Sequence, residues 1–191
     1  MNDRRKLLDP TLYSVVQAEG TSNVPELYER AGDLLDAWDM AGARALYEEA
    51  LAREPGNAQA YIGLGGCALQ EQRFDLALQL YGRALELSPT SASANLGLGN
   101  VHQHQERYAE AVKHYLEAVR LDDTLADAHW GAASAFEAMH DLVAMHRHAR
   151  RVLQLAPDSL MAPLARAMIK QAWWSSGRTL LRAWLFGRDS R

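Results

Sequence analysis

The sequence predicts an all-α protein built from helix pairs that repeat along the chain. The stretch from Ala58 to Thr90 contains two apolar patterns at helical spacing, which are joined by a short turn and closed by Pro89. The same pattern recurs in steps of 34 residues with no insertion between the copies. Helix-capping residues and prolines recur at the same step, so each expected helix pair has a defined beginning and end.

Four copies of this unit follow one another along the chain. They cover residues 24–57, 58–91, 92–125 and 126–157. The second copy carries the full set of marker residues, which are Tyr61, Leu64, Gly65, Phe74, Ala77, Tyr81, Ala84 and Pro89. A single helix pair cannot bury its own apolar stripe, so we expect the copies to stack and to bury these stripes against one another.

The spacing and the small–aromatic–small–proline pattern resemble the tetratricopeptide repeat (TPR) family. The resemblance extends over about Asn23 to Pro157. It implies antiparallel helix pairs that stack into a right-handed α-solenoid with a concave inner face. It does not imply one particular function, because this fold is a general scaffold.

Polar residues that can cap a helix N-terminus recur before the first helix of each pair. Asn23, Asn57 and Ser91 can each accept a hydrogen bond from the free backbone N–H groups of the first turn. Ser159 is expected to begin a fifth first helix in the same way. In the fourth copy Leu125 occupies this place, so Thr124 is expected to cap that helix one residue earlier.

Two segments flank the repeats. Residues 1–22 form an N-terminal extension in which Thr11–Ala18 is expected to be a short helix, either as a cap on the first repeat or as a dimer contact. Residues 158–191 are expected to hold a capping helix from Ser159 to about Trp174, followed by a basic aromatic tail.

The C-terminal segment is the most basic part of the chain. From Pro163 onward the net charge is +5, whereas the remainder carries −9. The tail could fold back as a cap, contact a partner or a second copy, or bind an anionic membrane surface. The residues available for a partner or membrane contact are Trp173, Trp174, Arg178, Arg182, Trp184 and Phe186.

Composition restricts the compartment and the partners. A net charge of −4 gives no general attraction to nucleic acid, so we expect no nucleic-acid partner. The single cysteine excludes an internal disulfide and favours a reducing compartment. No secretory leader and no apolar run long enough to span a membrane are found, so we expect a cytoplasmic protein whose membrane contacts, if any, are made by the C-terminal segment.

The sequence predicts no catalytic site, cofactor or metal. The letters of Gly63–Ala68 match a dinucleotide-binding motif, but no strand precedes them and the same Gly-Leu-Gly recurs one repeat later. His102 and His104 stand two residues apart on an expected helix, as do His146 and His148, so each pair points to different faces. We therefore expect a non-catalytic protein.

In the TPR family the concave face is built from the first helix of each pair. Carrying those positions over to this sequence gives the residues expected to bind a peptide. They are Tyr28, Gly32 and Leu35 in the first copy, Ile62, Gly63, Gly66 and Leu69 in the second, Leu96, Gly97, Asn100 and Gln103 in the third, and Trp130, Gly131, Ser134 and Glu137 in the fourth. Many of them are apolar, and contiguous exposed apolar surface usually marks an interaction site.

Four glycines on this face need an explanation, because glycine inside a helix costs roughly 0.5–1 kcal/mol relative to alanine. Either Gly63, Gly66, Gly97 and Gly131 open pockets for side chains of a bound peptide, or they relieve crowding where neighbouring first helices approach. The first explanation predicts that alanine at Gly63 and Gly66 stabilises the fold and weakens binding.

The residues on this face also indicate which partner is expected. One TPR subset binds the C-terminal carboxylate of heat-shock chaperones through lysines, asparagines and an arginine, and here only Asn100 matches. Ile62, Leu96 and Trp130 stand where basic residues or asparagines are required, so a carboxylate would find no cationic donor. The groove suits an apolar segment or an amphipathic helix instead, and in this it looks similar to secretion chaperones of the same fold.

The function expected from the sequence is that of an adaptor or chaperone which binds an apolar segment of a partner protein in the concave groove. A self-assembling scaffold is the alternative, in which the basic aromatic C-terminal segment of one molecule meets the acidic surface of another. A peripheral membrane-associated adaptor that uses the same segment is a further alternative.

Overall fold

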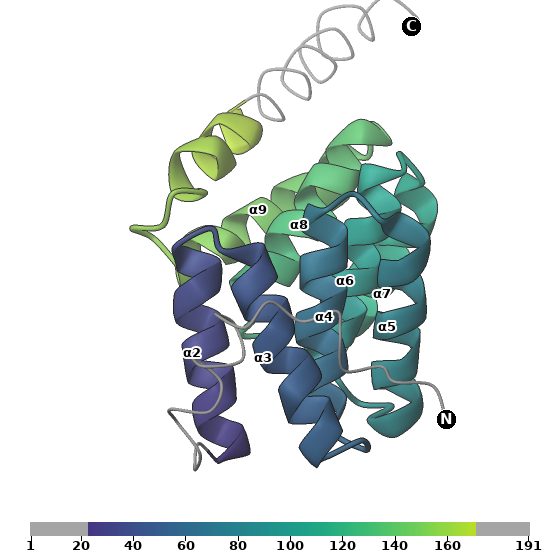
Figure 1. Cartoon of the computed structure of the whole chain (residues 1–191). Coiled ribbons are helices and arrows are strands. Elements are labelled where there is room, and N and C mark those ends of the chain that lie inside the picture. Colours follow the sequence, from purple (N-terminus) through teal and green to yellow (C-terminus); the bar gives the residue numbers. More distant parts are fainter. Residues whose placement is uncertain (1–22, 171–191) are drawn as a thin grey trace, which may run out of the picture.

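The computed structural model describes residues 23–170, and within them the fold is all α-helical (Figure 1). Eight helices follow one another: α2 (Val24–Asp36), α3 (Met40–Arg53), α4 (Ala58–Gln70), α5 (Phe74–Leu87), α6 (Ala92–His104), α7 (Tyr108–Leu121), α8 (Ala126–Ala138) and α9 (Leu142–Leu155). A further helical segment covers residues 162–170. The short helix expected at Thr11–Ala18 and the basic aromatic tail lie outside the described residues.

Three of the expected N-terminal caps are confirmed. The side-chain oxygen of Asn23 accepts from the backbone N–H of Glu26 at 3.0 Å. Asn57 accepts from Gln59 at 3.0 Å, and Ser91 accepts from Ala94 at 3.2 Å. These bonds satisfy donors that have no partner within the helix, and they fix where α2, α4 and α6 begin.

Two other predicted caps are wrong. Thr124 does not cap α8, because its hydroxyl donates to a side-chain oxygen of Asp122 at 2.6 Å, and α8 begins behind Leu125 without a side-chain cap. The hydroxyl of Ser159 donates to the backbone oxygen of Ala156 at 2.9 Å, and helical structure resumes only at residue 162. In both places a local turn uses the hydroxyl that the sequence pattern assigned to a helix.

The turns inside the pairs share one backbone conformation. Trp38, Gln72, Glu106 and His140 each have a positive φ, of 61°, 58°, 58° and 61°. After α4 the N–H of Arg73 donates to the oxygen of Ala68 at 2.8 Å, which closes the helix end in the manner of a Schellman motif. None of the four residues is glycine, although this left-handed conformation disfavours side chains that carry a Cβ.

Replacing Gln72 by glycine is therefore expected to raise the free energy of unfolding by about 0.5–1 kcal/mol. The matched control is Gln79→Gly at an exposed position inside α5, which should lower it by about 1 kcal/mol. Urea unfolding followed by circular dichroism measures both. A loss of stability in both variants would show that the turn does not strain the Gln72 backbone.

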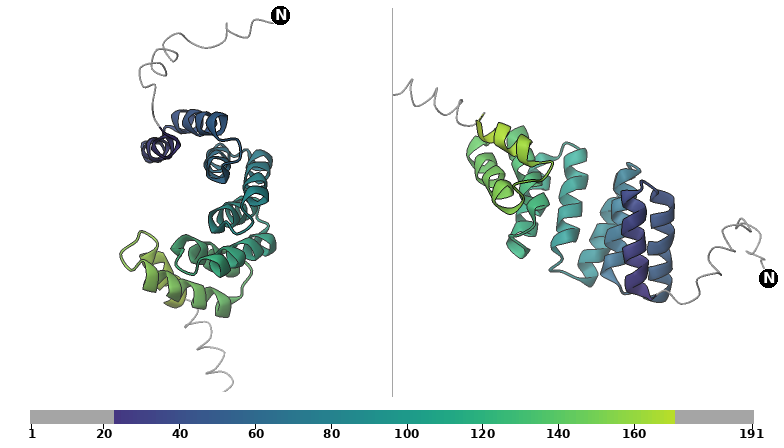
Figure 2. Two further views of the ribbon diagram at one scale, coloured as in Figure 1. Left: turned by 90° about the horizontal axis from the view of Figure 1, so that it is seen from below. Right: turned by 90° about the vertical axis from the view of Figure 1, so that its left-hand side faces the viewer.

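The helix pairs stack into an open arc (Figure 2). We call α2, α4, α6 and α8 the first helices and α3, α5, α7 and α9 the second helices. Besides packing against its own partner, α4 contacts α6, and α6 contacts α8. This close approach of successive first helices places them on the inner side of the arc and the second helices on its outer side, as the TPR resemblance implies.

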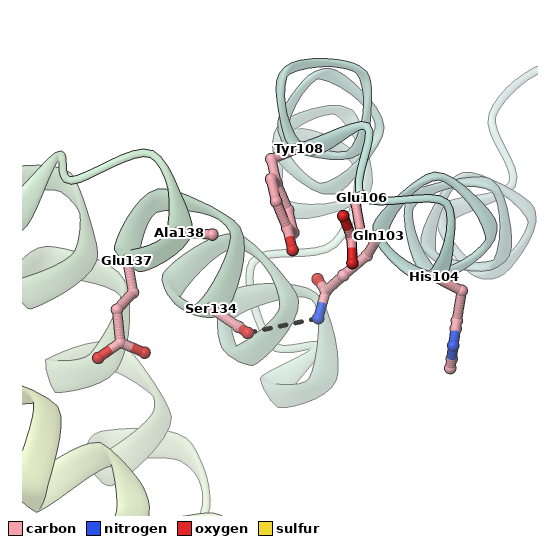
Figure 3. A pocket seen from close by; sticks show the side chains of 7 residues that line it. All are labelled: Gln103, His104, Glu106, Tyr108, Ser134, Glu137 and Ala138. Atoms are coloured by element: carbon pink, nitrogen blue, oxygen red, sulfur yellow. Dashed lines mark hydrogen bonds between the residues drawn. The ribbon is translucent and has the colours of Figure 1, made fainter.

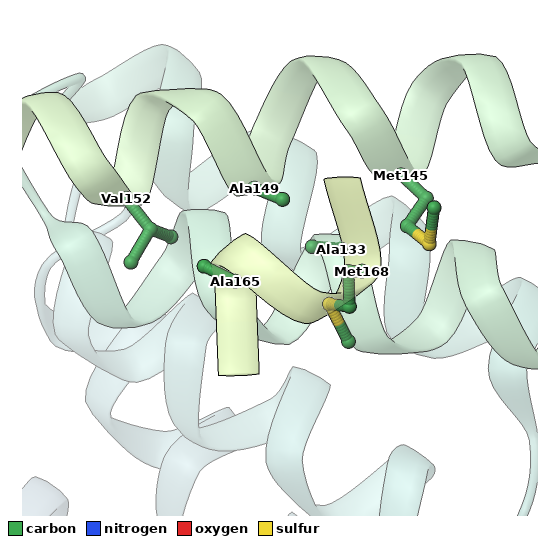
Figure 4. Close-up of a cluster of buried hydrophobic side chains, with 6 residues drawn as sticks. All are labelled: Ala133, Met145, Ala149, Val152, Ala165 and Met168. Atoms are coloured by element: carbon green, nitrogen blue, oxygen red, sulfur yellow. The ribbon is translucent and has the colours of Figure 1, made fainter. Parts of the chain in front are cut away.

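The helical segment at residues 162–170 caps the last pair. Its Ala165 and Met168 are buried in one cluster with Met145, Ala149 and Val152 of α9 (Figure 4). These contacts bury apolar surface that the last repeat would otherwise expose to water, which is the role of a terminal cap in a repeat protein. Capping by the first part of the C-terminal segment agrees with the sequence prediction.

Candidate functional site

The apolar residues predicted for the concave face lie on the first helices, but their side chains are only partly exposed to solvent. Tyr28, Leu35, Ile62, Leu96 and Trp130 are all half-buried, and each packs against a buried cluster beside it. On the concave face only the edges of these side chains are accessible, and they do not form a continuous exposed apolar surface.

Leu69 does not belong to the exposed part of this face. It is buried in a cluster with Ala77, Tyr81 and Leu98. Sequence position assigned it to the groove, but here it contributes to the core between the second and third repeats.

The explanation of the glycines as pockets is wrong for three of the four. A Cβ on Gly63 would lie less than 3.0 Å from ring carbons of Tyr47. A Cβ on Gly97 would meet the ring of Tyr81 equally closely, and one on Gly131 the ring of Tyr115. The space beside these glycines is filled by a tyrosine of the preceding second helix, so no pocket remains there for a peptide.

Each tyrosine is held between two small residues sixteen positions away on either side. Tyr81 lies between Gly65 of its own pair, where an added Cβ would come within 2.8 Å, and Gly97 of the next pair. Tyr115 lies in the same way between Gly99 and Gly131. Crowding between stacked pairs thus explains these glycines, and the tyrosine rings are the cause of the crowding.

Gly66 and Gly32 differ from the other inner glycines. The nearest atom to a Cβ on Gly66 would be the Tyr81 hydroxyl at 3.7 Å, and nothing would lie within 4 Å of one on Gly32. Among the inner glycines, only these two have open space beside them that a partner side chain could occupy.

A polar network crosses the inner side between the third and fourth repeats. The Tyr115 hydroxyl lies 2.8 Å from Oδ1 of Asn100 and 2.9 Å from Oε1 of Gln103, so its proton is shared between two amide oxygens. Gln103 in turn donates from Nε2 to the hydroxyl of Ser134 at 3.3 Å. Burial raises the pKa of Tyr115, so the hydroxyl keeps its proton and the network stays neutral.

Next to this network lies a cavity of about 460 Å³ between α6 and α8 (Figure 3). Three residues predicted for the concave face, Gln103, Ser134 and Glu137, line it together. The sequence did not predict its other lining residues, which are His104, Glu106, Tyr108 and Ala138. With two carboxylates, an amide and hydroxyl groups, this cavity can accept hydrogen bonds from a cationic or amide group.

The described residues give no indication of metal chemistry or of a membrane span. Between residues 23 and 170 no three histidine, cysteine or acidic side chains come together in a way that could hold a metal ion. In the same range no helix has the length and apolar character needed to cross a bilayer. Cys67 is buried, and burial raises the pKa of its thiol.

Stacked 34-residue helix pairs with a concave inner side define an α-helical repeat scaffold. The family model described as tetratricopeptide repeat matches residues 28–92 and 68–126, which together cover more than half of the chain. The chain therefore belongs to the TPR family, whose fold suggests a protein-interaction module. Curated protein sequences yield no significant match.

Solved structures with the same fold have low sequence identity to this chain. MamA is 20% identical, with a TM-score of 0.63 over 77% of this chain and 84% of MamA. YrrB, described as a TPR protein with an unusual peptide-binding site, is 18% identical, with a TM-score of 0.60 over 86% of this chain and 84% of YrrB. The first TPR of Spaghetti (RPAP3), bound to the HSP90 peptide SRMEEVD, is 18% identical, with a TM-score of 0.58 over 63% of this chain and 93% of the Spaghetti chain.

Proposed function

We propose that this protein is a non-catalytic adaptor or chaperone that binds a segment of a partner protein along its concave face. The observation that carries the proposal is the cavity between α6 and α8, where Gln103, Ser134 and Glu137 come together beside the first helices. One solved structure of the same fold, the first TPR of Spaghetti (RPAP3), is bound to an HSP90 peptide, which supports the choice of a peptide as the ligand.

The half-buried apolar residues would provide the second part of the site. Trp130 stands one helical turn before Ser134 on α8, and Leu96 stands two turns before Gln103 on α6. A segment that places an apolar side chain against Trp130 or Leu96 could therefore place a polar side chain in the cavity. Because these apolar residues are only partly exposed, we infer that one or two apolar side chains of the partner are bound rather than a continuous apolar stripe.

The charge of the cavity favours a cationic side chain in the partner. Glu106 and Glu137 both line it, and no lysine or arginine is among its lining residues between positions 23 and 170. A lysine or arginine of the partner would gain charge-assisted hydrogen bonds there, whereas a terminal carboxylate would be repelled. This agrees with the sequence, in which the positions that bind a C-terminal carboxylate in one TPR subset hold no lysine or arginine.

Selection from a library of displayed random peptides tests the proposal. We expect enriched peptides to combine an apolar residue with a nearby lysine or arginine. Their affinity should fall at least about tenfold in Trp130→Ala and in Glu137→Lys, as loss of a buried contact or a reversed charge predicts.

The control is Lys113→Glu on the outer side of α7, which should leave the affinity unchanged. Circular dichroism establishes that each variant is folded, since Trp130 also packs against the core. Enriched peptides that bind Trp130→Ala and Glu137→Lys as well as the unmodified protein would place the binding site elsewhere and overturn the proposal.

A further inference from the structure

A second recess lies on the outer side of the arc, between the second helices α7 and α9. It has a volume of about 740 Å³. Val143 and Leu116 both line it and are 73% and 39% exposed, so the recess presents apolar surface to the solvent. The same recess is lined by Arg147, Arg150 and Arg151. We call these five residues the basic groove.

The positive charge of the basic groove is only partly neutralised within the molecule. Arg151 pairs with the carboxylate of Asp123. Arg147 and Arg150 are exposed and make no ion pair with any residue between positions 23 and 170. Helix α9 contains three arginines and no acidic residue, so its charge is not balanced along the helix as it is in α7.

Comparison with the preceding repeat shows that the fold does not require this surface. One repeat earlier, Gly82 takes the place of Leu116 and Ala109 that of Val143. Lys113 takes the place of Arg147, so one cation recurs, but Leu116 takes the place of Arg150 and Glu117 that of Arg151. The combination of two apolar side chains with two arginines that are unpaired among the described residues is therefore not repeated in the preceding repeat.

The opposite end of the solenoid has the complementary character. Helix α2 carries four exposed acidic residues, Glu26, Glu29, Asp33 and Asp36, against one arginine. Trp38 stands two residues after the end of this helix and is 80% exposed. The two surfaces are therefore complementary. Each combines exposed apolar side chains with charged ones, and their charges are opposite.

We propose that α2 and Trp38 of one copy of this chain dock into the basic groove of a second copy. The carboxylates of α2 would pair with Arg147 and Arg150, and the indole of Trp38 would cover Val143 and Leu116. The contact joins two different surfaces, so each bound copy leaves one acidic and one basic surface free. Such a heterologous contact adds further copies head to tail, as an open chain or as a ring.

The proposed contact is independent of the proposed peptide site. The basic groove lies on the outer second helices, whereas the candidate peptide site lies on the inner first helices. An assembled protein would therefore present its concave faces repeatedly. Failure of peptide binding would leave this inference intact, and failure of assembly would leave the peptide site intact.

Molar mass measured by light scattering over a concentration series tests the inference with the full chain. At low salt the mass should rise with concentration above that of the 21.2 kDa monomer. It should return to the monomer value at about 0.5 M salt, where surface charges are strongly screened. A protein that stays monomeric at low salt at every concentration overturns the inference.

Charge reversal tests the surfaces themselves. The double variant Arg147→Glu, Arg150→Glu should weaken self-association at least about tenfold, and so should Glu29→Arg, Asp33→Arg. Mixing the two variants should restore assembly, because each then supplies the charge that the other lacks. The variant Trp38→Ser should weaken assembly without any change in charge.

The matched control is Arg83→Glu, Lys113→Glu, which makes the same change in net charge on the outer side of α5 and α7 and should leave assembly unchanged. Assembly that persists in Arg147→Glu, Arg150→Glu overturns the inference, as does a mixture of the two reversed variants that stays monomeric. A monomeric protein that binds an acidic peptide through Arg147 and Arg150 would assign the basic groove to another protein and would also overturn it.

Discussion

An alanine at Gly97 is expected to lower the free energy of unfolding by about 1–3 kcal/mol, although alanine is normally the better helix former. The added methyl group would lie less than 3.0 Å from the ring of Tyr81, which has Gly65 on its other side and is 4% exposed. The ring cannot move away without pressing on the backbone of its own pair. The fold must therefore shift the helices apart, which loses packing on both sides of the tyrosine.

Gly66→Ala is the matched control for this effect. Both glycines lie in first helices, but a methyl group on Gly66 would meet nothing closer than the Tyr81 hydroxyl at 3.7 Å. This variant should raise the free energy of unfolding by about 0.5–1 kcal/mol, because only the helix propensity changes. Urea unfolding of both variants measures the difference. Equal stabilisation by the two alanines would show that the Tyr81 ring has room to move.

Acidification to about pH 4 is expected to remove about 3 kcal/mol of stability through His148 alone. Burial lowers the pKa of this side chain from 6.5 to about 4, and the nearby His129 and Arg147 lower it further. Below pH 6.5 His148 is protonated in the unfolded chain but stays neutral in the folded chain. The free energy of unfolding therefore decreases as the pH is lowered from 6.5 to about 4. Unfolding midpoints in urea, measured at a series of pH values, follow this loss.

The geometry around His148 explains why it resists a proton. Its Nδ1 lies 3.0 Å from Nδ1 of His129, whose Nε2 lies 3.2 Å from the backbone oxygen of Asp123. In the neutral pair His129 donates from Nε2 to that oxygen, so its Nδ1 can only accept, and His148 donates to it. The other face of the His148 ring stacks on Phe136, with the ring centres 5.7 Å apart. A charge on His148 would thus be buried between an aromatic ring and a second histidine.

The first repeat supplies a matched variant for this experiment. Leu27 and Leu46 occupy the positions equivalent to His129 and His148, and they pack in one cluster. The double variant His129→Leu, His148→Leu should therefore fold with the leucine packing that the first repeat already has. It should lose much less stability than the unmodified protein between pH 6.5 and 4. Some dependence should remain, because burial also lowers the pKa of His102 and of His114. A profile as steep as that of the unmodified protein would rule out the histidine pair as the cause.

The order of the helices could be read from the sequence because it depends on local chemistry. Asn23, Asn57 and Ser91 begin helices wherever the chain places them, since a cap bonds to backbone groups within three residues. Pro55 and Pro89 follow the ends of α3 and α5 for the equally local reason that proline lacks an N–H and has a fixed φ. The repeat of 34 residues then places each pair beside the next.

The details of the inner face required the tertiary structure. Whether Gly63 opens a pocket or accommodates Tyr47, and whether Leu69 lies in the groove or in the core, depends on how closely consecutive pairs approach. The spacing of sixteen residues between each tyrosine and its two small neighbours was present in the sequence, and it is the signal that could have identified this packing.

The sequence by itself determined the all-α class, the repeat, the starts of α2, α4 and α6, and the family, because these follow from contacts within a few residues or from periodicity. Only the tertiary structure decided which inner residues remain accessible, that Gln103, Ser134 and Glu137 share a cavity, and that His129 and His148 meet. Those arrangements depend on distances between side chains of different helices, and close packing fixes such distances only when all the helices are in place.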